Sequence, residues 1–177
     1  MASIQDRVIG AMRLDVNTFE EVERDQTATG QAALVVLAGS ISGGLGTGRL
    51  TGILLGAILG LAAWALAAWV VMFVGTRLLP GRNTEADFGQ VARAIGFAQA
   101  PYLLGILAII PILGYLIRFA LWIWVLVAMI VAVRHALDYD DTVRAVFVCL
   151  IAWAIMFVMA MIVATIGAGA TLVGAGL

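Results

Sequence analysis

Residues 50–76 read LTGILLGAILGLAAWALAAWVVMFVGT and carry no charged side chain. A transmembrane helix needs about 20 mainly apolar residues to cross about 30 Å of hydrocarbon, so this stretch is long enough to span a bilayer. Four further uncharged runs occupy residues 26–48, 94–117, 119–133 and 145–177, of which only 119–133 is short for a span. With 63% hydrophobic residues, the chain leaves too little polar sequence for a separate soluble domain.

The five runs predict an all-α fold: a polytopic integral membrane bundle of five transmembrane helices in a single domain, residues 1–177. The expected spans cover residues 28–48, 50–76, 94–114, 116–134 and 145–168. Residues 1–26 are expected to form one amphipathic cytoplasmic helix, because apolar side chains recur at steps of three and four from Ile4 to Val22. This helix could lie on lipid or pack on the bundle. Its acidic polar face favours packing, since interfacial helices usually carry basic faces.

The distribution of arginine predicts an orientation. If all five runs cross the membrane, eight of the ten basic residues share one side, and only Arg49 and Arg118 lie on the other. The positive-inside rule then places the N-terminus in the cytoplasm and the C-terminus outside. All eleven carboxylates share the side of the eight arginines, so that surface has no charge attraction for anionic lipid or nucleic acid.

Glycine and proline positions predict how the spans pack. Glycines 44, 48, 52, 56 and 60 follow one another at four-residue spacing, which lets helices approach closely. Gly52, Gly56 and Gly60 of the second span give the clearer packing face. Packing within the bundle is the simpler interpretation, and a homo-oligomer stays open. Pro101 and Pro111 each lack a backbone donor, which predicts kinks in the third span.

Several shorter patterns predict local structure. Thr84 and Asp87 have the spacing of a capping box, which predicts a helix that starts at Thr84 and leads into the third span. Residues 140–142 are expected to cap the fifth helix. Trp122 and Trp124 are expected at the outer membrane interface.

The sequence contains no motif for a nucleophilic triad, a zinc site, a phosphate loop or a cysteine cluster. We therefore expect no enzyme activity, no cofactor and no metal. A lone His135 is read as an interfacial side chain, with haem-type ligation as the alternative. Residues 138–141 begin like a calcium loop, but Val143 stands where the loop needs glycine, so a solvated connection is favoured over a metal site.

Three segments resemble the bacterial branch of the Yip family, named for Ypt/Rab-interacting proteins. They are residues 19–25 followed by TATGQA at 27–32, ADFGQVARAIGFAQAP at 86–101, and VRHALDYDDTVRA at 133–145. The resemblance covers nearly the whole chain and implies a five-helix protein of the bacterial inner membrane without an established catalytic site. The chain lacks the Asp-Leu-Tyr-Gly-Pro type motif of the eukaryotic relatives, so their Rab connection is not implied. The family-like positions are Phe19, Glu20, Glu23, Asp25, Gly30, Asp87, Gly89, Gln90, Arg93, Gln99, Pro101, Arg134, Asp138 and Arg144.

The predicted orientation brings these segments together at the cytoplasmic ends of the spans. We expect an interaction cluster there, in which carboxylates of the first segment or Asp138 pair with arginines of the other two. Its members are Glu20, Glu23, Asp25, Asp87, Arg93, Arg134, Asp138 and Arg144.

The leading interpretation is a non-enzymatic protein that organises membrane lipid or other membrane proteins through this cluster. Broken spans mark many transport sites, so a small channel or transporter for a neutral solute, using Gln99 and the prolines, is one alternative. An accessory subunit of a larger membrane complex is another.

Overall fold

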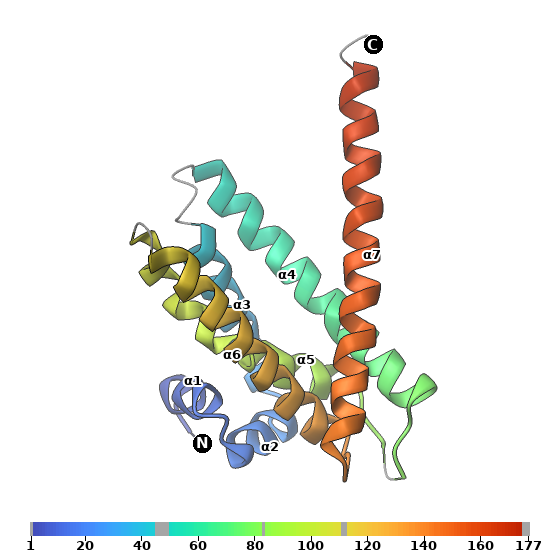
Figure 1. Cartoon of the computed structure of the whole chain (residues 1–177). Helices are drawn as coiled ribbons and strands as arrows, with labels where there is room; N and C mark the ends of the chain where they lie inside the picture. The colour runs from blue at the N-terminus through green and yellow to red at the C-terminus, as the bar shows by residue number, and fades with distance from the viewer. Residues whose placement is uncertain (1, 45–49, 83, 111–112, 175–177) are drawn as a thin grey trace.

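The computed structural model describes residues 2–44, 50–82, 84–110 and 113–174, with the side chains at 44, 50–52 and 166–174 left out. All regular structure in these residues is helical (Figure 1). The elements are α1 (Ile4–Met12), α2 (Val16–Arg24), α3 (Ala28–Gly44), α4 (Leu50–Phe73), the π-helical turn η2 (Val74–Leu78), α5 (Phe88–Phe97), the 3₁₀-helix η3 (Ala100–Ile109), α6 (Leu113–Ala136) and α7 (Thr142–Gly174).

Four stretches in the described residues are long and apolar enough to cross a membrane: Ile53–Leu78, Phe88–Ile109, Leu113–Ala136 and Thr142–Thr165. The predicted first span is shorter, because α3 has 17 residues and therefore a length of about 26 Å. Residues 45–48 of that prediction lie outside the described part of the chain. The short uncharged run at 119–133 is extended at both ends, so that α6 reaches 24 residues.

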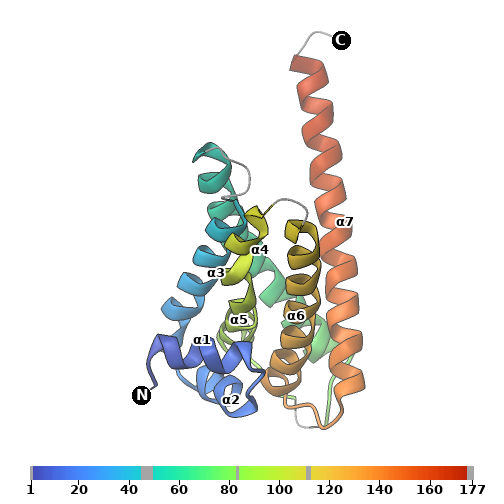
Figure 2. The ribbon, with the colours of Figure 1, turned by 60° about the vertical axis from the view of Figure 1, so that its left-hand side comes forward.

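The packed core lies toward the end of the bundle where α1 and α2 cross beneath the longer helices (Figure 2). In α4 the buried side chains begin at Ala68, and in α7 they lie in the first turns, from Ala145 to Ala152. The remainder of both helices exposes large apolar side chains, such as Ile58 and Phe157, each 66% exposed. A soluble protein rarely exposes such surface. The bare helix faces therefore fit a surrounding of lipid.

The prediction of one continuous helix over residues 1–26 is corrected by the structure, which has two helices, α1 and α2. Leu14 between them has a φ of 61°, a left-handed conformation that costs a residue with a side chain about 1–2 kcal/mol. Asp15 then begins α2, because its carboxylate accepts the backbone N–H of Asn17 at 3.1 Å. A short polar side chain that bonds the backbone in this way favours a new helix start over continuation.

Both N-terminal helices pack on the bundle. Phe19 and Val22 are buried where α2 contacts α5 and α6. The indole N–H of Trp124 donates to the Met12 carbonyl at 2.9 Å, in the last turn of α1. Trp124 therefore belongs with α1 and not, as predicted, with the opposite interface.

The helix before the third span starts later than predicted. Asp87 and Gln90 form the capping box of α5, with the Asp87 carboxylate accepting the Gln90 backbone N–H at 2.9 Å and the Gln90 side chain accepting that of Asp87 at 2.8 Å. Thr84 lies outside the helix because its hydroxyl donates to the Leu137 carbonyl at 2.9 Å, next to the end of α6. α5 begins at Phe88 for this reason.

The third span changes helix type in its middle. α5 ends at Phe97 and continues after a turn as the 3₁₀-helix η3, whose second residue is Pro101. Proline has no N–H to bond the carbonyl four residues earlier, so the α-helix cannot run through this position unbroken. Pro111 lies outside the described residues.

The surroundings of two ladder glycines, Gly56 and Gly60, are described, and only Gly60 of these two packs against another helix. A Cβ placed on Gly60 would lie 2.2 Å from the Ser40 hydroxyl oxygen, so α3 and α4 touch there. Gly56 has no atom within 4 Å of such a Cβ, and the side-chain surroundings of Gly52 are not described. Four residues turn an α-helix by about 400°, so successive glycines drift about 40° around the helix and leave the contact line.

Gly96, which is outside the ladder, lies against two other helices. A Cβ there would lie 2.8 Å from the Ala32 Cβ and 3.1 Å from the Trp64 indole nitrogen. Trp64 also donates to the Ala92 carbonyl at 2.9 Å. Gly96 thus lets α3, α4 and α5 meet at one point.

We predict that Gly96→Ala destabilises the protein by about 1–3 kcal/mol, because the added methyl group overpacks this junction. The measurement is the unfolding midpoint of the purified protein in mild detergent. Gly30→Ala is the matched control, since Gly30 lies in the first turn of α3 with open space around it. Equal midpoints for the two variants would show that the junction tolerates a side chain.

Candidate functional site

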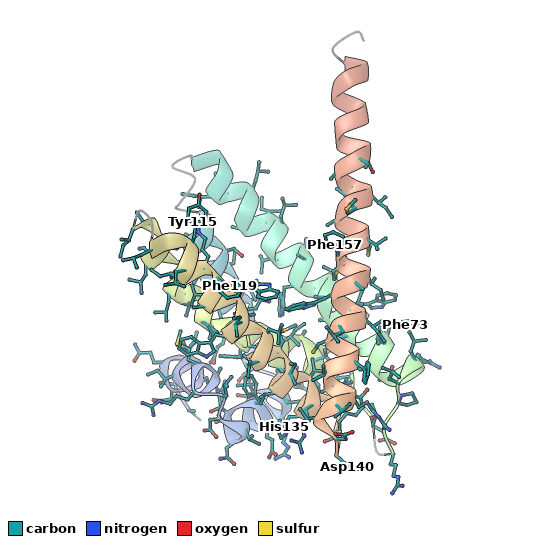
Figure 3. The ribbon with its side chains drawn as sticks, in the orientation of Figure 1. Phe73, Tyr115, Phe119, His135, Asp140 and Phe157 are labelled. Carbon is teal, nitrogen blue, oxygen red and sulfur yellow. The ribbon has the colours of Figure 1, made fainter. Side chains whose placement is uncertain are left out.

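Three charged parts of the chain meet at one end of the bundle, which we call the charged end (Figure 3). They are the helices α1 and α2, the segment 79–87 between η2 and α5, and the segment 137–141 between α6 and α7. His135 and Asp140 mark this end in Figure 3, and Tyr115 lies at the other. The predicted cluster residues share this end, but the structure does not bring all of them into contact.

Arg7 is one of two buried arginines described at the charged end, with 2% of its surface exposed. Its guanidinium donates to Glu21 through Nη2 at 2.8 Å and Nε at 3.3 Å, and to Asp25 at 2.5 Å. Its Nη1 donates to the Gln31 side chain at 2.9 Å. Hydrogen bonds from Thr27, and then from Arg7, lower the pKa of Asp25 to about 2. One arginine therefore ties α1 to the C-terminal part of α2 and to α3.

Arg7 was not among the predicted cluster residues, although a signal for it exists. Arg7, Gly10 and Ala11 lie three and four residues apart, and all three are buried. Small residues next to a charged residue on one face of a helix allow a neighbouring helix to approach closely. The added Cβ of Gly10, for example, would lie 2.1 Å from the Thr18 hydroxyl.

Arg93 caps the C-terminal end of α2 from a distant part of the chain. It is 5% exposed, and its Nε donates to the carbonyls of Val22 at 3.0 Å and Glu23 at 3.1 Å. Its Nη2 donates to the Glu23 carbonyl as well, and its Nη1 to the Thr29 hydroxyl at 3.4 Å. The last carbonyls of a helix lack partners within the helix, and a positive charge there is favourable. Arg93 supplies both the donors and the charge.

Arg134 plays a similar part at the end of α6. Its guanidinium donates to the carbonyls of Tyr139 at 3.3 Å and Asp140 at 3.2 Å, and to the Thr142 hydroxyl at 3.0 Å. Asp141 caps the start of α7, as predicted for residues 140–142, by accepting the Val143 backbone N–H at 2.9 Å. The segment between α6 and α7 is therefore held from both sides.

Tyr139 and Arg144 join this segment to the end of the second span. The Tyr139 hydroxyl lies 2.9 Å from the Gly75 carbonyl and 2.8 Å from the Leu79 carbonyl, between which its one proton is shared. Burial raises the pKa of Tyr139 to about 12, so it stays a donor at any physiological pH. Arg144 donates to the Pro80 carbonyl at 3.0 Å and lies over the Tyr139 ring.

The predicted pairs of carboxylates with Arg93, Arg134 or Arg144 are not among the ion pairs of the described residues. The pairs found there are Arg7–Glu21, Arg7–Asp25 and Arg24–Glu20 at 3.6 Å. His135 lies 3.7 Å from Glu20 and forms an ion pair with it only when the imidazole is protonated. The physical reason is position: the three arginines lie beside helix ends and connecting segments, where free backbone carbonyls take their donors.

Asp87 and Asp138 also have roles in the backbone conformation. Asp87 is the N-cap of α5. Asp138 follows the last turn of α6 with a φ of 49°, a conformation that aspartate tolerates better than most residues. It lets the Tyr139 N–H reach back to the Arg134 carbonyl at 2.9 Å. Neither side chain forms an ion pair with an arginine in the described part of the chain.

Among the carboxyl groups at the charged end, Glu23 has the pKa that burial raises most. It is 7% exposed. Burial, and then the charge of Asp138, raise its pKa from 4.5 to about 7, against the opposing charges of Arg24 and Arg93. Its backbone carbonyl accepts hydrogen bonds from Arg93. Glu23 can therefore exchange a proton near neutral pH.

Two surface hollows at the charged end are lined by described residues. The larger, which we call the acidic groove, encloses about 540 Å³ and is lined by Arg7, Asn17, Glu20, Glu21, Arg24 and Asp25. The second encloses about 300 Å³ beside Arg134, His135 and Asp138. No group of three or more His, Cys, Asp or Glu side chains among the described residues is arranged to hold a metal ion.

We predict that Glu23→Gln stabilises the protein at pH 8, by on the order of 1–3 kcal/mol, and leaves it unchanged below pH 4.5. Because the pKa of Glu23 is raised on folding, its favourable contribution is complete below pH 4.5 and is lost as the pH rises through about 7. Glutamine removes this loss. The measurement is the unfolding midpoint across pH 4–8.

The control for this prediction is Glu85→Gln, which removes an exposed carboxylate from the segment 79–87. It should follow the parent at every pH. A Glu23→Gln variant that also parallels the parent from pH 4 to pH 8 would contradict a buried, proton-binding Glu23.

Comparison with known proteins adds one match. The family model described as the Yip1 domain matches residues 14–163, which includes α2 to α6 and most of α7. The searches of curated proteins and of solved structures found no match. The apolar helices and the matched domain together make the chain an integral membrane protein. Since the match covers most of the sequence, the chain belongs to the Yip family.

Proposed function

We propose that this protein is a non-enzymatic membrane organiser that holds a partner protein in the acidic groove at its charged end. The groove itself is the observation that carries the proposal, because it is the largest hollow described at this end and three of its six lining residues are carboxylates. Glu20 and Glu21 are 40% and 42% exposed. A basic segment of a neighbouring protein could reach both.

The charge balance favours a protein partner over anionic lipid at this end. Residues 1–26 contain six carboxylates and three arginines, a net charge of −3. Arg7 is already bonded to Glu21 and Asp25. The Arg24–Glu20 pair is long and exposed, and such pairs contribute about 0–1 kcal/mol to stability. A basic side chain of a partner can therefore take the place of Arg24 beside Glu20 at little cost in free energy.

The residues of the charged end support an organising role over a catalytic one. Arg7 and Arg93 are occupied in joining helices, and no carboxylate lies in the four long apolar stretches. Enzymes and proton-coupled transporters of the membrane place ionisable groups at that depth. The groove, in contrast, offers exposed charge on a firmly packed support.

The proposal also includes the orientation of the protein in the membrane and the membrane in which it lies. Eight arginines lie in the three segments of the charged end or in the helices that begin or end there, so the positive-inside rule favours a cytoplasmic charged end and an external C-terminus. This requires α3 to cross as a fifth span, with help from residues at its ends. The resemblance to bacterial relatives favours the bacterial inner membrane.

A passive pathway for a small neutral solute is the second candidate, and the 3₁₀-helix η3 favours it. Irregular backbone at membrane depth is tolerated where it is buried in protein or lines a cavity. η3 borders a hollow of about 270 Å³, but it starts in packed core, with Ala100 and Pro101 buried. Solute flux into liposomes that contain the purified protein tests this candidate directly.

The groove proposal predicts a charge-dependent contact in intact membranes. A photo-crosslinking amino acid in place of Asn17, which lines the groove, should give one dominant protein adduct. Glu20→Arg should reduce its yield about tenfold, because reversing one charge repels a basic segment and slows association. Mass spectrometry of the adduct identifies the partner and shows whether the crosslinked segment is basic.

Glu85→Arg makes the same charge change outside the groove and should leave the yield unaltered. An adduct that survives Glu20→Arg unchanged, or a crosslinked segment without basic residues, would contradict the proposal. A partner present in constant ratio to the protein would indicate an accessory subunit of a larger complex.

A further inference from the structure

The end of the bundle away from the charged end has its own hollow, formed where α3, η3 and α6 meet. It encloses about 270 Å³, and we call it the glycine groove; the residues that matter here are Gly39, Gly43, Tyr102, Gly105, Arg118 and Leu121. Helix contacts explain why it is glycine-lined. A Cβ on Gly39 would lie 3.2 Å from the Tyr102 Cβ, and one on Gly105 would lie 3.4 Å from the Ser42 hydroxyl.

We propose that the glycine groove binds the phosphate and glycerol part of one membrane phospholipid, with Arg118 as the cation that receives the phosphate. Arg118 is exposed and makes no hydrogen bond or ion pair with any described residue. The guanidinium fork matches a phosphate oxygen pair, which makes arginine well suited to phosphate.

The charge pattern of the chain directs an anion to this place. All eleven carboxylates lie between Asp6 and Asp141 in segments that belong to the charged end. Arg118 therefore has no acidic side chain of its own chain to neutralise it at the far end. An anion from the surroundings can therefore pair with it.

The depth of Arg118 fits a lipid phosphate better than a free anion. Arg118 is the sixth residue of α6, about 8 Å from the start of a helix about 36 Å long. A helix of this length crosses about 30 Å of hydrocarbon and extends into both headgroup regions. A long arginine side chain at this depth reaches the phosphate layer.

The groove's size and walls also fit part of a lipid. Pockets for whole small molecules enclose about 300–1,000 Å³, so 270 Å³ suits a headgroup portion whose acyl chains remain outside. Gly43 has open space around it, and Leu121 and Ala108 add apolar wall. The half-buried Tyr102 also lines the groove, and its phenol is a further hydrogen-bond donor.

The test is native mass spectrometry of the purified protein in detergent with one added lipid at a time. Phosphatidylglycerol and phosphatidylethanolamine should each be retained as one molecule per chain, and diacylglycerol, which lacks the phosphate, about tenfold less. Arg118→Gln should lower phospholipid retention about tenfold, as expected for loss of a charge-assisted bond, and Arg118→Lys should keep part of it.

Two size and charge controls accompany these variants. Gly43→Leu should fill the groove and abolish retention, whereas Gly56→Leu, which also places a side chain into open space, should behave as the parent. Arg82→Gln removes an exposed arginine from the segment 79–87 and should change nothing. If Gly43→Leu fails to fold, the Arg118 variants alone decide.

Three results would overturn the inference. Equal retention of diacylglycerol and phospholipid would show that the phosphate is not recognised. Unchanged retention by Arg118→Gln would exclude this arginine. Displacement of the phospholipid by inorganic phosphate at millimolar concentration would make the groove a free-anion site. None of these results bears on the acidic groove, which lies at the other end.

Discussion

A charged side chain is costly inside a bilayer, and this constraint shapes the whole chain. The carboxylates are confined to three segments that the helices bring to one end, and eight of the ten arginines lie in these segments or in the helices that begin or end there. Because the polar side chains are concentrated there, they can bond neighbouring helix ends and connecting segments, which the apolar side chains of the helices cannot do. In lipid, helices gain no hydrophobic driving force from touching one another. Bonds at the helix ends then carry much of the specificity of the arrangement.

Arginine does this work mainly through backbone carbonyls. Arg93 holds the end of α2, Arg134 holds the end of α6, and Arg144 holds the segment after η2. Each bond joins parts of the chain that lie apart in the sequence. The charged end therefore both holds the helices together and presents a charged surface. Arg7 differs from these three, because it donates to side chains, two of which are carboxylates. The carboxylates left over, among them Glu20, are the ones that a partner can reach.

The sequence predicts the helical class, the approximate spans and the gathering of charge, because these depend on hydropathy and on the short segments between the runs. It does not predict which atoms the arginines bind, since free carbonyls arise only once a helix ends and a distant arginine is placed beside it. The apolar spacing from Met12 to Val16 predicts a helix that runs through Leu14, and only the Asp15 cap shows why the helix breaks there. Gly96 lies outside the four-residue ladder, and its importance comes from three helices that meet in space.

The most direct test of the account is the position of the two chain ends relative to the membrane. In a Cys149→Ala background, one cysteine is placed at Ala2, next to α1, or added after Leu177, and intact cells are treated with a membrane-impermeant maleimide. The account predicts that the C-terminal cysteine reacts and that the cysteine at residue 2 reacts only after the membrane is opened. Labelling of both ends in intact cells, or of neither, would mean an even number of crossings and would contradict a charged end confined to the cytoplasmic side.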